Sequence, residues 1–443
     1  MKRDLTNGSI ISSLLAFSGP MILGNLFQQV YNIADTFIVG RFLGENALAA
    51  VGSTYTLTTF LYSIIIGLCM GCGSLVSYCF GERNERRLKG CLNISFLIIS
   101  SVTLVTELIT LCFSNGILKL LHTPMKIMSL TSDYVRIILS GIVFIFLYSF
   151  YSFMLRGIGN SLTPLILLGS SSVLNIILDF IFVADLDMGV KGAAYATVIS
   201  QAVSGVGLCV YTLAKEPLLR LSFKKKSWKD CSFGEVVRMS TAASVQQSVM
   251  NFGILMIQGL VNSFGTTVMA AFTVAVKIDT VAYMPAQEFG NAFSLFISQN
   301  YGAKKYDRIK NCVKYSFGIS AAFCVLISIL VAIFSNNLMG LFISDDKTEI
   351  IAVGSQYLVT EGSFYVGIGI LFLLYGYYRG INRPEIALVL TVISLGTRVA
   401  LAYFLSGFEA IGVFGIWISI PIGWVLADVV GIMYMNKKGR VTN

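Results

Sequence analysis

Four polar side chains recur along an apolar segment near the start of the chain. Asn25, Gln28, Asn32 and Asp35 stand at steps of three, four and three residues, which places them on one face of an α-helix. Amides at such positions can hydrogen-bond to neighbouring membrane helices. A charge at the bilayer centre costs about 2.5–3.5 kcal/mol, and Asp35 has no cation within its own helix. We therefore expect Asp35 to have a functional role.

A second polar cluster comes later in the chain. Asn175 and Asp179 stand one helical turn apart in an apolar run, and Thr197 lies in the next apolar segment. If the three segments meet, they present two carboxylates, an amide oxygen and a hydroxyl. Such an all-oxygen set suits a hard cation such as Na⁺, and paired carboxylates that cannot both ionise readily suit a shared proton. We expect a cation to bind here.

The segments that position these side chains are long and apolar. The chain has 443 residues, of which 55% are hydrophobic and 12% charged, and its mean hydropathy is +0.77. A soluble domain carries about 25% charged residues, so a soluble multidomain enzyme is excluded. A membrane helix needs roughly 20 apolar residues. We expect twelve helices, at 13–39, 48–79, 91–114, 129–155, 162–184, 190–214, 240–264, 268–300, 311–335, 350–378, 384–406 and 410–435.

The basic residues alternate between successive loops. When the amino terminus is placed inside, the inner loops carry most of the 32 Lys and Arg residues, which predicts that both termini are cytoplasmic. The first apolar run continues past Phe37 without a small-residue cleavage site, so we expect no cleaved leader. The net charge of +9 is then explained by topology and by contact with anionic lipid, and we expect no nucleic acid partner.

Two halves of the chain read alike. Phe-Gly-Glu-Arg at 80–83 is echoed by Tyr-Gly-Ala-Lys at 301–304, and Arg156-Gly157 by Arg379-Gly380. These repeats are offset by 221 and 223 residues, which indicates duplication of a six-helix unit. We expect an N-lobe at 1–214, a basic cytoplasmic linker at 215–238 and a C-lobe at 239–443. Rocking of two such bundles can alternate access to a central cavity.

The duplication serves as a control for the polar cluster. At these offsets Asp35 corresponds to Met256, Asn175 to Arg398, Asp179 to Ala402 and Thr197 to Ile420. The four oxygen-bearing side chains are therefore absent from the second copy, although its glycine motifs remain. We infer that the fold does not require them, and that the chain has a single cation site in its first half.

Other polar residues fall within the predicted helices. Gln247, Asn251 and Gln258 form a stripe without an acid in segment 240–264, where they line a cavity or join helices. Lys277 and Asp279 do not share a helical face, so we expect them to pair with other helices or to face a wet cavity. The segment of Lys277 and Asp279 also carries Glu288. Four single charges have no evident partner, namely Glu107, Glu361, Arg398 and Asp428, and Arg398 is the one we expect to face the centre.

Several kinds of chemistry find no support. The single histidine, His122, excludes a site built on several imidazoles, and no phosphate-binding Gly-x-x-x-x-Gly-Lys-Ser/Thr loop is present. Transport against a concentration gradient must therefore draw its energy from an ion gradient or from a partner protein. Cys69 and Cys72 form a Cys-x-x-Cys without a second pair, next to Gly67 and Gly73. We interpret this segment as helix packing by small residues rather than as a metal or redox site.

The chain resembles the multidrug and toxic compound extrusion (MATE) family, and is most similar to its MepA-like and DinF-like bacterial exporters. Residues 19–21 (Gly-Pro-Met), 32–36 (Asn-Ile-Ala-Asp-Thr) and 39–41 (Val-Gly-Arg) look like the first helix of that family, and 285–303 looks like the end of its eighth. The resemblance implies that the coupling ion binds at Asp35, Asn175, Asp179 and Thr197. A second bacterial pattern has an acid in helix seven, which is missing here, so coupling in the second lobe is not expected.

We therefore expect an all-α polytopic membrane protein with about twelve transmembrane helices in two pseudo-symmetric six-helix lobes around a central cavity. It would act as a monomeric antiporter, not an enzyme, that exports cationic or amphipathic drug-like compounds in exchange for H⁺ or Na⁺, with no cofactor and with membrane lipid around it. The expected substrate cavity contains Gln28, Asn32, Gln247, Asn251 and Arg398.

Three alternatives remain open. A lipid-linked oligosaccharide flippase of the same superfamily would need several cavity arginines for pyrophosphate, whereas the predicted spans offer only Arg398 because Arg379 is placed in a loop. A membrane enzyme would need clustered His, Asp or Ser groups near a membrane surface. A passive channel would differ from an antiporter in its insensitivity to uncouplers.

Overall fold

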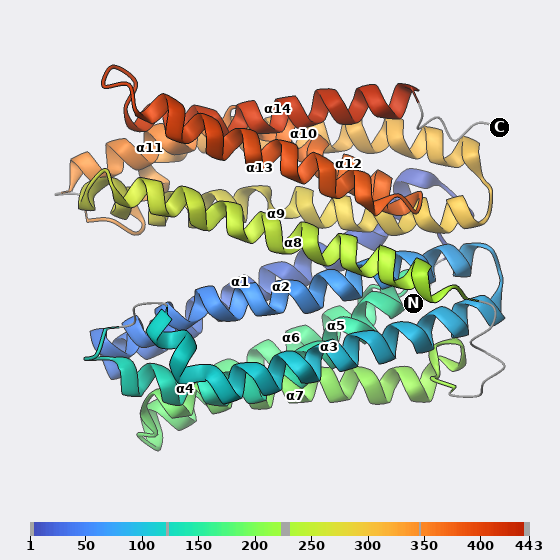
Figure 1. The fold of residues 1–443 in the computed structure, drawn as a ribbon, viewed down its shortest axis with the longest axis horizontal. Coiled ribbons are helices and arrows are strands. Elements are labelled where there is room, and N and C mark those ends of the chain that lie inside the picture. The colour runs from blue at the N-terminus through green and yellow to red at the C-terminus, as the bar shows by residue number, and fades with distance from the viewer. Residues whose placement is uncertain (1–3, 121–123, 223–230, 345–346, 438–443) are drawn as a thin grey trace. The chain divides into compact units, whose positions relative to one another are not determined.

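The structure is a computed structural model that describes residues 4–120, 124–222, 231–344 and 347–437. Within these ranges the regular structure is entirely helical (Figure 1). The chain divides into two compact units: unit 1 contains Met1–Leu5 and Gly19–Ser244, and unit 2 contains Thr6–Ser18 and Val245–Asn443. Two continuous helices, α1 (Ile10–Leu43) and α8 (Phe233–Asn262), therefore begin in one unit and end in the other.

Unit 1 is built from helices that follow the predicted apolar segments. Besides its parts of α1 and α8 it contains α2 (Glu45–Gly81), α3 (Glu85–Leu120), α4 (Met128–Ser140), α5 (Ile142–Gly157), α6 (Leu162–Asp179), the π-helical η1 (Phe180–Asp185), α7 (Gly189–Lys215) and the short η2 (Pro217–Leu219). Its core contains a group of aromatic rings from α3 and α5, with Phe96 and Phe150 edge to face at 5.3 Å. Such pairs add stability beyond their buried area.

Unit 2 repeats this order. It contains the rest of α8, α9 (Thr266–Gly302), α10 (Tyr306–Gly340), α11 (Thr348–Gly362), α12 (Tyr365–Gly380), α13 (Pro384–Ser406) and α14 (Val413–Lys437). Phe272 of α9 stacks on Trp417 of α14 with an interplanar angle of 6°. Tyr357 of α11 meets both rings edge to face, so one aromatic cluster ties three helices together.

The backbone confirms the internal duplication. Left-handed residues recur at equivalent places: Gly44 and Gly265, Arg83 and Lys304, Gly159 and Asn382, and Gly189 and Gly412. Two bent helix pairs also correspond, α4 with α5 at 41° and α11 with α12 at 52°. We predicted each pair as one segment, 129–155 and 350–378. The structure shows a bend after Ser140 and again after Gly362, where the helical hydrogen-bond ladder is interrupted.

The described helices account for the predicted membrane crossings. Nine of them are long and apolar enough to cross a bilayer, and the two bent pairs raise this number to eleven. The twelfth predicted segment is α8, whose 30 residues are long enough but include the polar stripe. His122 and residues 223–230 of the predicted linker lie outside the described residues.

Both described ends of the linker are attached to α3. Asn93 donates from Nδ2 to the Ser222 carbonyl oxygen at 2.6 Å and accepts from the Ser222 N–H at 3.0 Å. After residues 223–230, which are not described, Cys231 forms a disulfide with Cys91 of α3. Arg87 then pairs with Glu235 at 2.8 Å in the first turn of α8. The start of α8 is therefore fixed to the rest of unit 1.

The segment around Cys69 and Cys72 packs as predicted from its small residues. Both cysteines are buried free thiols, and the described residues contain no group of three or more metal-binding side chains. A Cβ on Gly67 or Gly71 would overlap the α8 backbone at Ser244 or Met239. The Ser244 hydroxyl also donates to the Ile64 carbonyl oxygen at 2.9 Å. These contacts join α2 to α8 backbone to backbone.

Candidate functional site

Asp35 and Asp179 come from distant parts of the sequence and adjoin each other in unit 1. Asp35 lies in the last third of α1, and Asp179 is the last residue of α6. The two helices pack closely, because the Phe27 ring lies 3.6 Å from the place of a Cβ on Gly169. The carboxyl groups come close enough to interact directly. The pairing predicted from the sequence is therefore present in the structure.

Three of the four carboxyl oxygens of this pair have no hydrogen-bond donor among the described residues. Asp179 is fully buried and Asn175, one turn earlier on α6, is 2% exposed. Asp35 Oδ1, both Asp179 carboxyl oxygens and the Asn175 side-chain amide have no hydrogen-bond partner among the described residues. Buried polar atoms are rarely left without a partner, and two adjacent carboxylates repel each other. A bound cation or a shared proton would relieve both problems.

Two tyrosine side chains lie near the carboxyl pair, and the sequence analysis did not predict them. Tyr31, one helical turn before Asp35, and Tyr134 of α4 both lie close enough to interact electrostatically with the two carboxyl groups. Tyr62 of α2 adjoins Tyr31 and interacts with Gln201 of α7. The i, i+4 spacing of Tyr31 and Asp35 was visible in the sequence, whereas Tyr62 and Tyr134 carried no such signal.

Thr197 comes from a different helix than the carboxyl pair. It is half-buried on α7, which packs against α6. Within the described part of the chain, no hydrogen bond joins its hydroxyl to Asp35, Asn175 or Asp179. Gln201 lies one turn further along α7. Its Oε1 is buried and has no hydrogen-bond partner among the described residues. Gln201 interacts with Tyr62, and Thr197 stays a predicted ligand of the ion.

The other polar residues of α1 and α8 differ in their surroundings. Gln28 is exposed and interacts with Tyr31, while Asn32 donates to Gln29 Oε1 at 3.3 Å within its own helix. On α8, Gln247 lines a cavity in unit 2. Gln258 donates to Asn262 at 2.9 Å, one turn along. Asn251 is half-buried and lines neither of the two cavities described below.

Unit 2 contains a second acidic group that we had not brought together from the sequence. Asp279 of α9 and Glu361 of α11 are 4% and 1% exposed and interact with each other. The Tyr365 hydroxyl donates to Asp279 Oδ1 at 2.7 Å. With Arg398 of α13 they line a largely apolar cavity of about 660 Å³. Arg398 therefore does face a cavity, and it meets the partners that the sequence did not reveal. Lys277 is exposed on the other side of α9.

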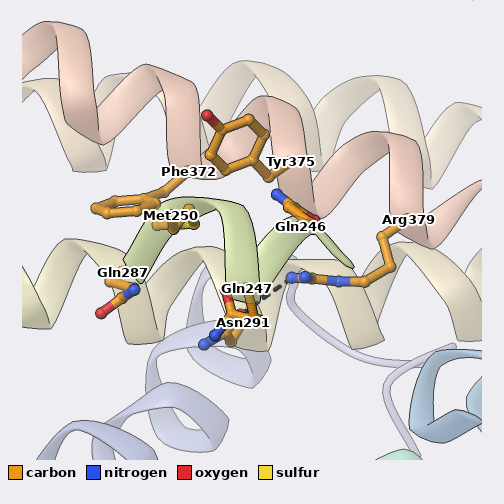
Figure 2. A pocket seen from close by; sticks show the side chains of 8 residues that line it. All are labelled: Gln246, Gln247, Met250, Gln287, Asn291, Phe372, Tyr375 and Arg379. Carbon is orange, nitrogen blue, oxygen red and sulfur yellow. Dashed lines mark hydrogen bonds between the residues drawn. The ribbon is translucent and has the colours of Figure 1, made fainter. Parts of the chain in front are cut away.

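The sequence analysis placed Arg379 in a loop, and this prediction is wrong. Arg379 lies in the last turn of α12 and is only 4% exposed. Its guanidinium reaches into a smaller cavity of unit 2, beside Gln246, Gln247 and Asn291 (Figure 2). The mistake arose because Arg-Gly at the end of an apolar run is typical of a helix boundary at a membrane surface.

Comparisons with known proteins agree with this architecture. The MatE family model matches residues 20–181 and again 242–404, so each half contains one copy. The chain is 28% identical to "Probable multidrug resistance protein YoeA" of Bacillus subtilis (strain 168), over 98% of this chain and 96% of that protein. It is 23% identical to "Multidrug export protein MepA" of Staphylococcus aureus (strain MSSA476), over 82% and 80% of the two chains.

A solved structure shows the same fold. The outward-facing conformation of a multidrug resistance MATE family transporter of the MOP superfamily superposes with a TM-score of 0.91, over 99% of this chain and 98% of that one, at 23% identity. The family model matches once in each half of the duplicated chain. The chain belongs to the MATE family of multi-pass membrane transporters.

Proposed function

We propose that this protein exports cationic or amphipathic compounds across the cytoplasmic membrane in exchange for Na⁺ or H⁺, with both termini in the cytoplasm. The main support is the Asp35–Asp179 pair, in which Asp35 Oδ1 and both Asp179 oxygens are buried without a hydrogen-bond partner among the described residues. The names of the relatives, a multidrug resistance protein and a multidrug export protein, support export of varied compounds. The stripe of amides on α8 supplies no acid for coupling.

The proposed cycle follows from charge. In the outward-facing state a cation binds at Asp35 and Asp179 and neutralises them, and the relief of their repulsion bends or rotates α1. This movement displaces the exported compound. The loaded protein then rocks inward and releases the ion to the cytoplasm. If Na⁺ is the ion, the two carboxylates and the Asn175 amide oxygen would hold it, because hard cations prefer oxygen ligands.

The energy available is sufficient for drug resistance. One charge that crosses 100 mV releases about 2.3 kcal/mol. Since about 1.4 kcal/mol corresponds to a factor of ten, exchange of one ion can maintain a concentration ratio of roughly fifty-fold. No nucleotide is needed for this.

Exchange in proteoliposomes tests the proposal. Purified protein is reconstituted with ethidium inside, and a Na⁺ gradient or a pH gradient is imposed separately. We expect one of the two gradients to drive ethidium movement, and its collapse by an ionophore to stop it. Movement that depends on neither gradient would instead indicate a passive channel.

A threonine variant tests how far the ion site extends onto α7. Because the Thr197 hydroxyl has no hydrogen bond to the carboxyl pair within the described residues, we expect Thr197→Ala to slow ethidium efflux only by roughly 2- to 10-fold. Thr197→Ser, which keeps the hydroxyl, should restore the rate. A complete loss of efflux in Thr197→Ala would show that this hydroxyl binds the ion directly.

A further inference from the structure

The smaller cavity of unit 2 is lined by several polar side chains. It is formed by α8, α9 and α12 and is partly open to its surroundings. Figure 2 shows Gln246, Gln247 and Met250 on α8, Gln287 and Asn291 on α9, and Phe372, Tyr375 and Arg379 on α12. None of these residues takes part in the carboxyl pair of unit 1.

Two hydrogen bonds hold Arg379 in place, and its guanidinium has further N–H donors. Its Nε donates to Ser294 Oγ at 3.2 Å, and Nη2 donates to Asn291 Oδ1 at 3.0 Å. These bonds use two of the five guanidinium N–H groups, and the other three have no partner among the described residues. The fork of a guanidinium matches the two oxygens of a carboxylate. Burial in a narrow cavity strengthens such a contact because little water competes for it.

The amide side chains around Arg379 can accept or donate hydrogen bonds. Gln246 is 2% exposed and its Oε1 is buried without a partner in the part of the chain that the structure describes. An amide can turn so that either its oxygen or its NH₂ group faces a ligand. Gln246 therefore offers an unused hydrogen-bonding group close to the arginine. This is a second sign, independent of Arg379, that the cavity takes a polar ligand.

The charge around Arg379 favours a single anionic group. Asn291, which accepts from Arg379, donates from Nδ2 to Glu288 Oε1 at 3.1 Å. Glu288 is therefore linked to the guanidinium through one amide and offsets part of its charge. Glu288 repels any anion placed beside Arg379, and it repels a group with two or more negative charges more strongly than a single carboxylate.

The remaining lining includes two aromatic rings and a methionine. Phe372 and Tyr375 present their rings from one face of α12, with ring centroids 6.4 Å apart, and Met250 faces them from α8. Aromatic rings stack well on other flat rings, and a methionine side chain adapts to varied shapes.

We propose that this cavity binds the carboxylate of a flat aromatic organic acid, with the carboxylate on Arg379 and the ring between Met250 and the Phe372–Tyr375 pair. The inference deepens the proposed function, on which it rests, because it adds compounds with a carboxylate to the exported class. It also gives unit 2, which lacks the ion site of unit 1, a role in selecting the cargo.

Binding of a matched pair of ligands tests this site. Purified protein in detergent is titrated by calorimetry with 1-naphthoate and, separately, with 1-naphthylmethylammonium, which has the same ring system and the opposite charge. We expect 1-naphthoate to bind more tightly. Arg379→Gln should weaken 1-naphthoate binding by about ten-fold or more, and Gln246→Leu by about two- to ten-fold. Arg136→Gln, an exposed arginine of unit 1, is the matched control and should bind as the wild type does.

Each other outcome overturns the site. Equal or tighter binding of the ammonium ligand, or unchanged 1-naphthoate binding in Arg379→Gln, would exclude a carboxylate on this arginine. Tighter binding of inorganic pyrophosphate than of 1-naphthoate would indicate a phosphate site instead. If Arg379→Gln fails to fold, Gln246→Leu and the ligand pair on the wild type decide alone. The titration needs no ion gradient, so absent binding with intact ethidium exchange overturns this inference and not the antiport proposal.

Discussion

Asp35→Asn and Asp179→Asn are each expected to abolish coupled efflux. Asparagine keeps the size of the side chain but cannot carry the negative charge that a cation or proton neutralises. Either replacement also removes the repulsion between the two carboxyl groups, which adjoin in unit 1. Without that repulsion, ion binding no longer changes the energy of α1 relative to α6. We expect ethidium retention in cells that express either variant to match that of cells without the protein.

Asp133→Asn is the matched control for this experiment. Asp133 is an exposed carboxylate of unit 1 whose ion pair with Lys191, at 3.2 Å, lies at the surface. Such exposed pairs contribute little, so the control should export ethidium at the wild-type rate. Protein levels in the membrane are compared by immunoblot. Wild-type efflux from both Asp35→Asn and Asp179→Asn would refute the assignment of the ion site.

Gly71→Ala is expected to destabilise unit 1. The added methyl group would overlap the carbonyl of Met239 on α8, and backbone cannot move aside as a side chain can. Overpacking in a well-packed core costs about 1–3 kcal/mol. Since α8 is also tied to α2 at Ser244 and to α3 at Glu235, the helix has little freedom to shift. We expect a lower melting temperature for the purified variant and less protein in the membrane.

Gly116→Ala provides the contrast. Gly116 lies in α3, where nothing is within 4 Å of the place of an added Cβ. Alanine is favoured over glycine inside a helix by about 0.5–1 kcal/mol, so this variant should melt at the same or a higher temperature. Equal melting temperatures for Gly71→Ala and Gly116→Ala would show that α2 and α8 are not in backbone contact.

The membrane helices and their duplication could be predicted because each depends on local sequence. Apolar runs end close to the observed helix ends, as at 190–214 and Gly189–Lys215. The repeat offsets of 221 and 223 residues recur in the left-handed turns. The bends after Ser140 and Gly362 were missed because an apolar pattern continues through them. The pattern records which residues face lipid, not where the helical hydrogen bonds break.

The site could be predicted only in part. Asp35, Asn175 and Asp179 stood out because ionisable and amide groups are costly in an apolar segment. Asp279, Glu361 and Arg398 stood out for the same reason, yet only the structure brings them to one cavity. Tyr62, Tyr134 and Gln246 gave no signal, since tyrosine and glutamine are ordinary residues in membrane helices. Arg379 was misplaced because burial at a helix end depends on neighbouring helices, which a single sequence does not reveal.

Two helices run unbroken from unit 1 into unit 2, and this has a mechanical consequence. In α8 the division falls between Ser244, which is anchored to α2, and Gln246, which lines the small cavity. In α1 the division between the units lies beside Pro20, which has no N–H and so removes one helical hydrogen bond. A change in the angle between the units would therefore bend or twist these two helices. In α8 such a change would act next to the amides that lie beside Arg379.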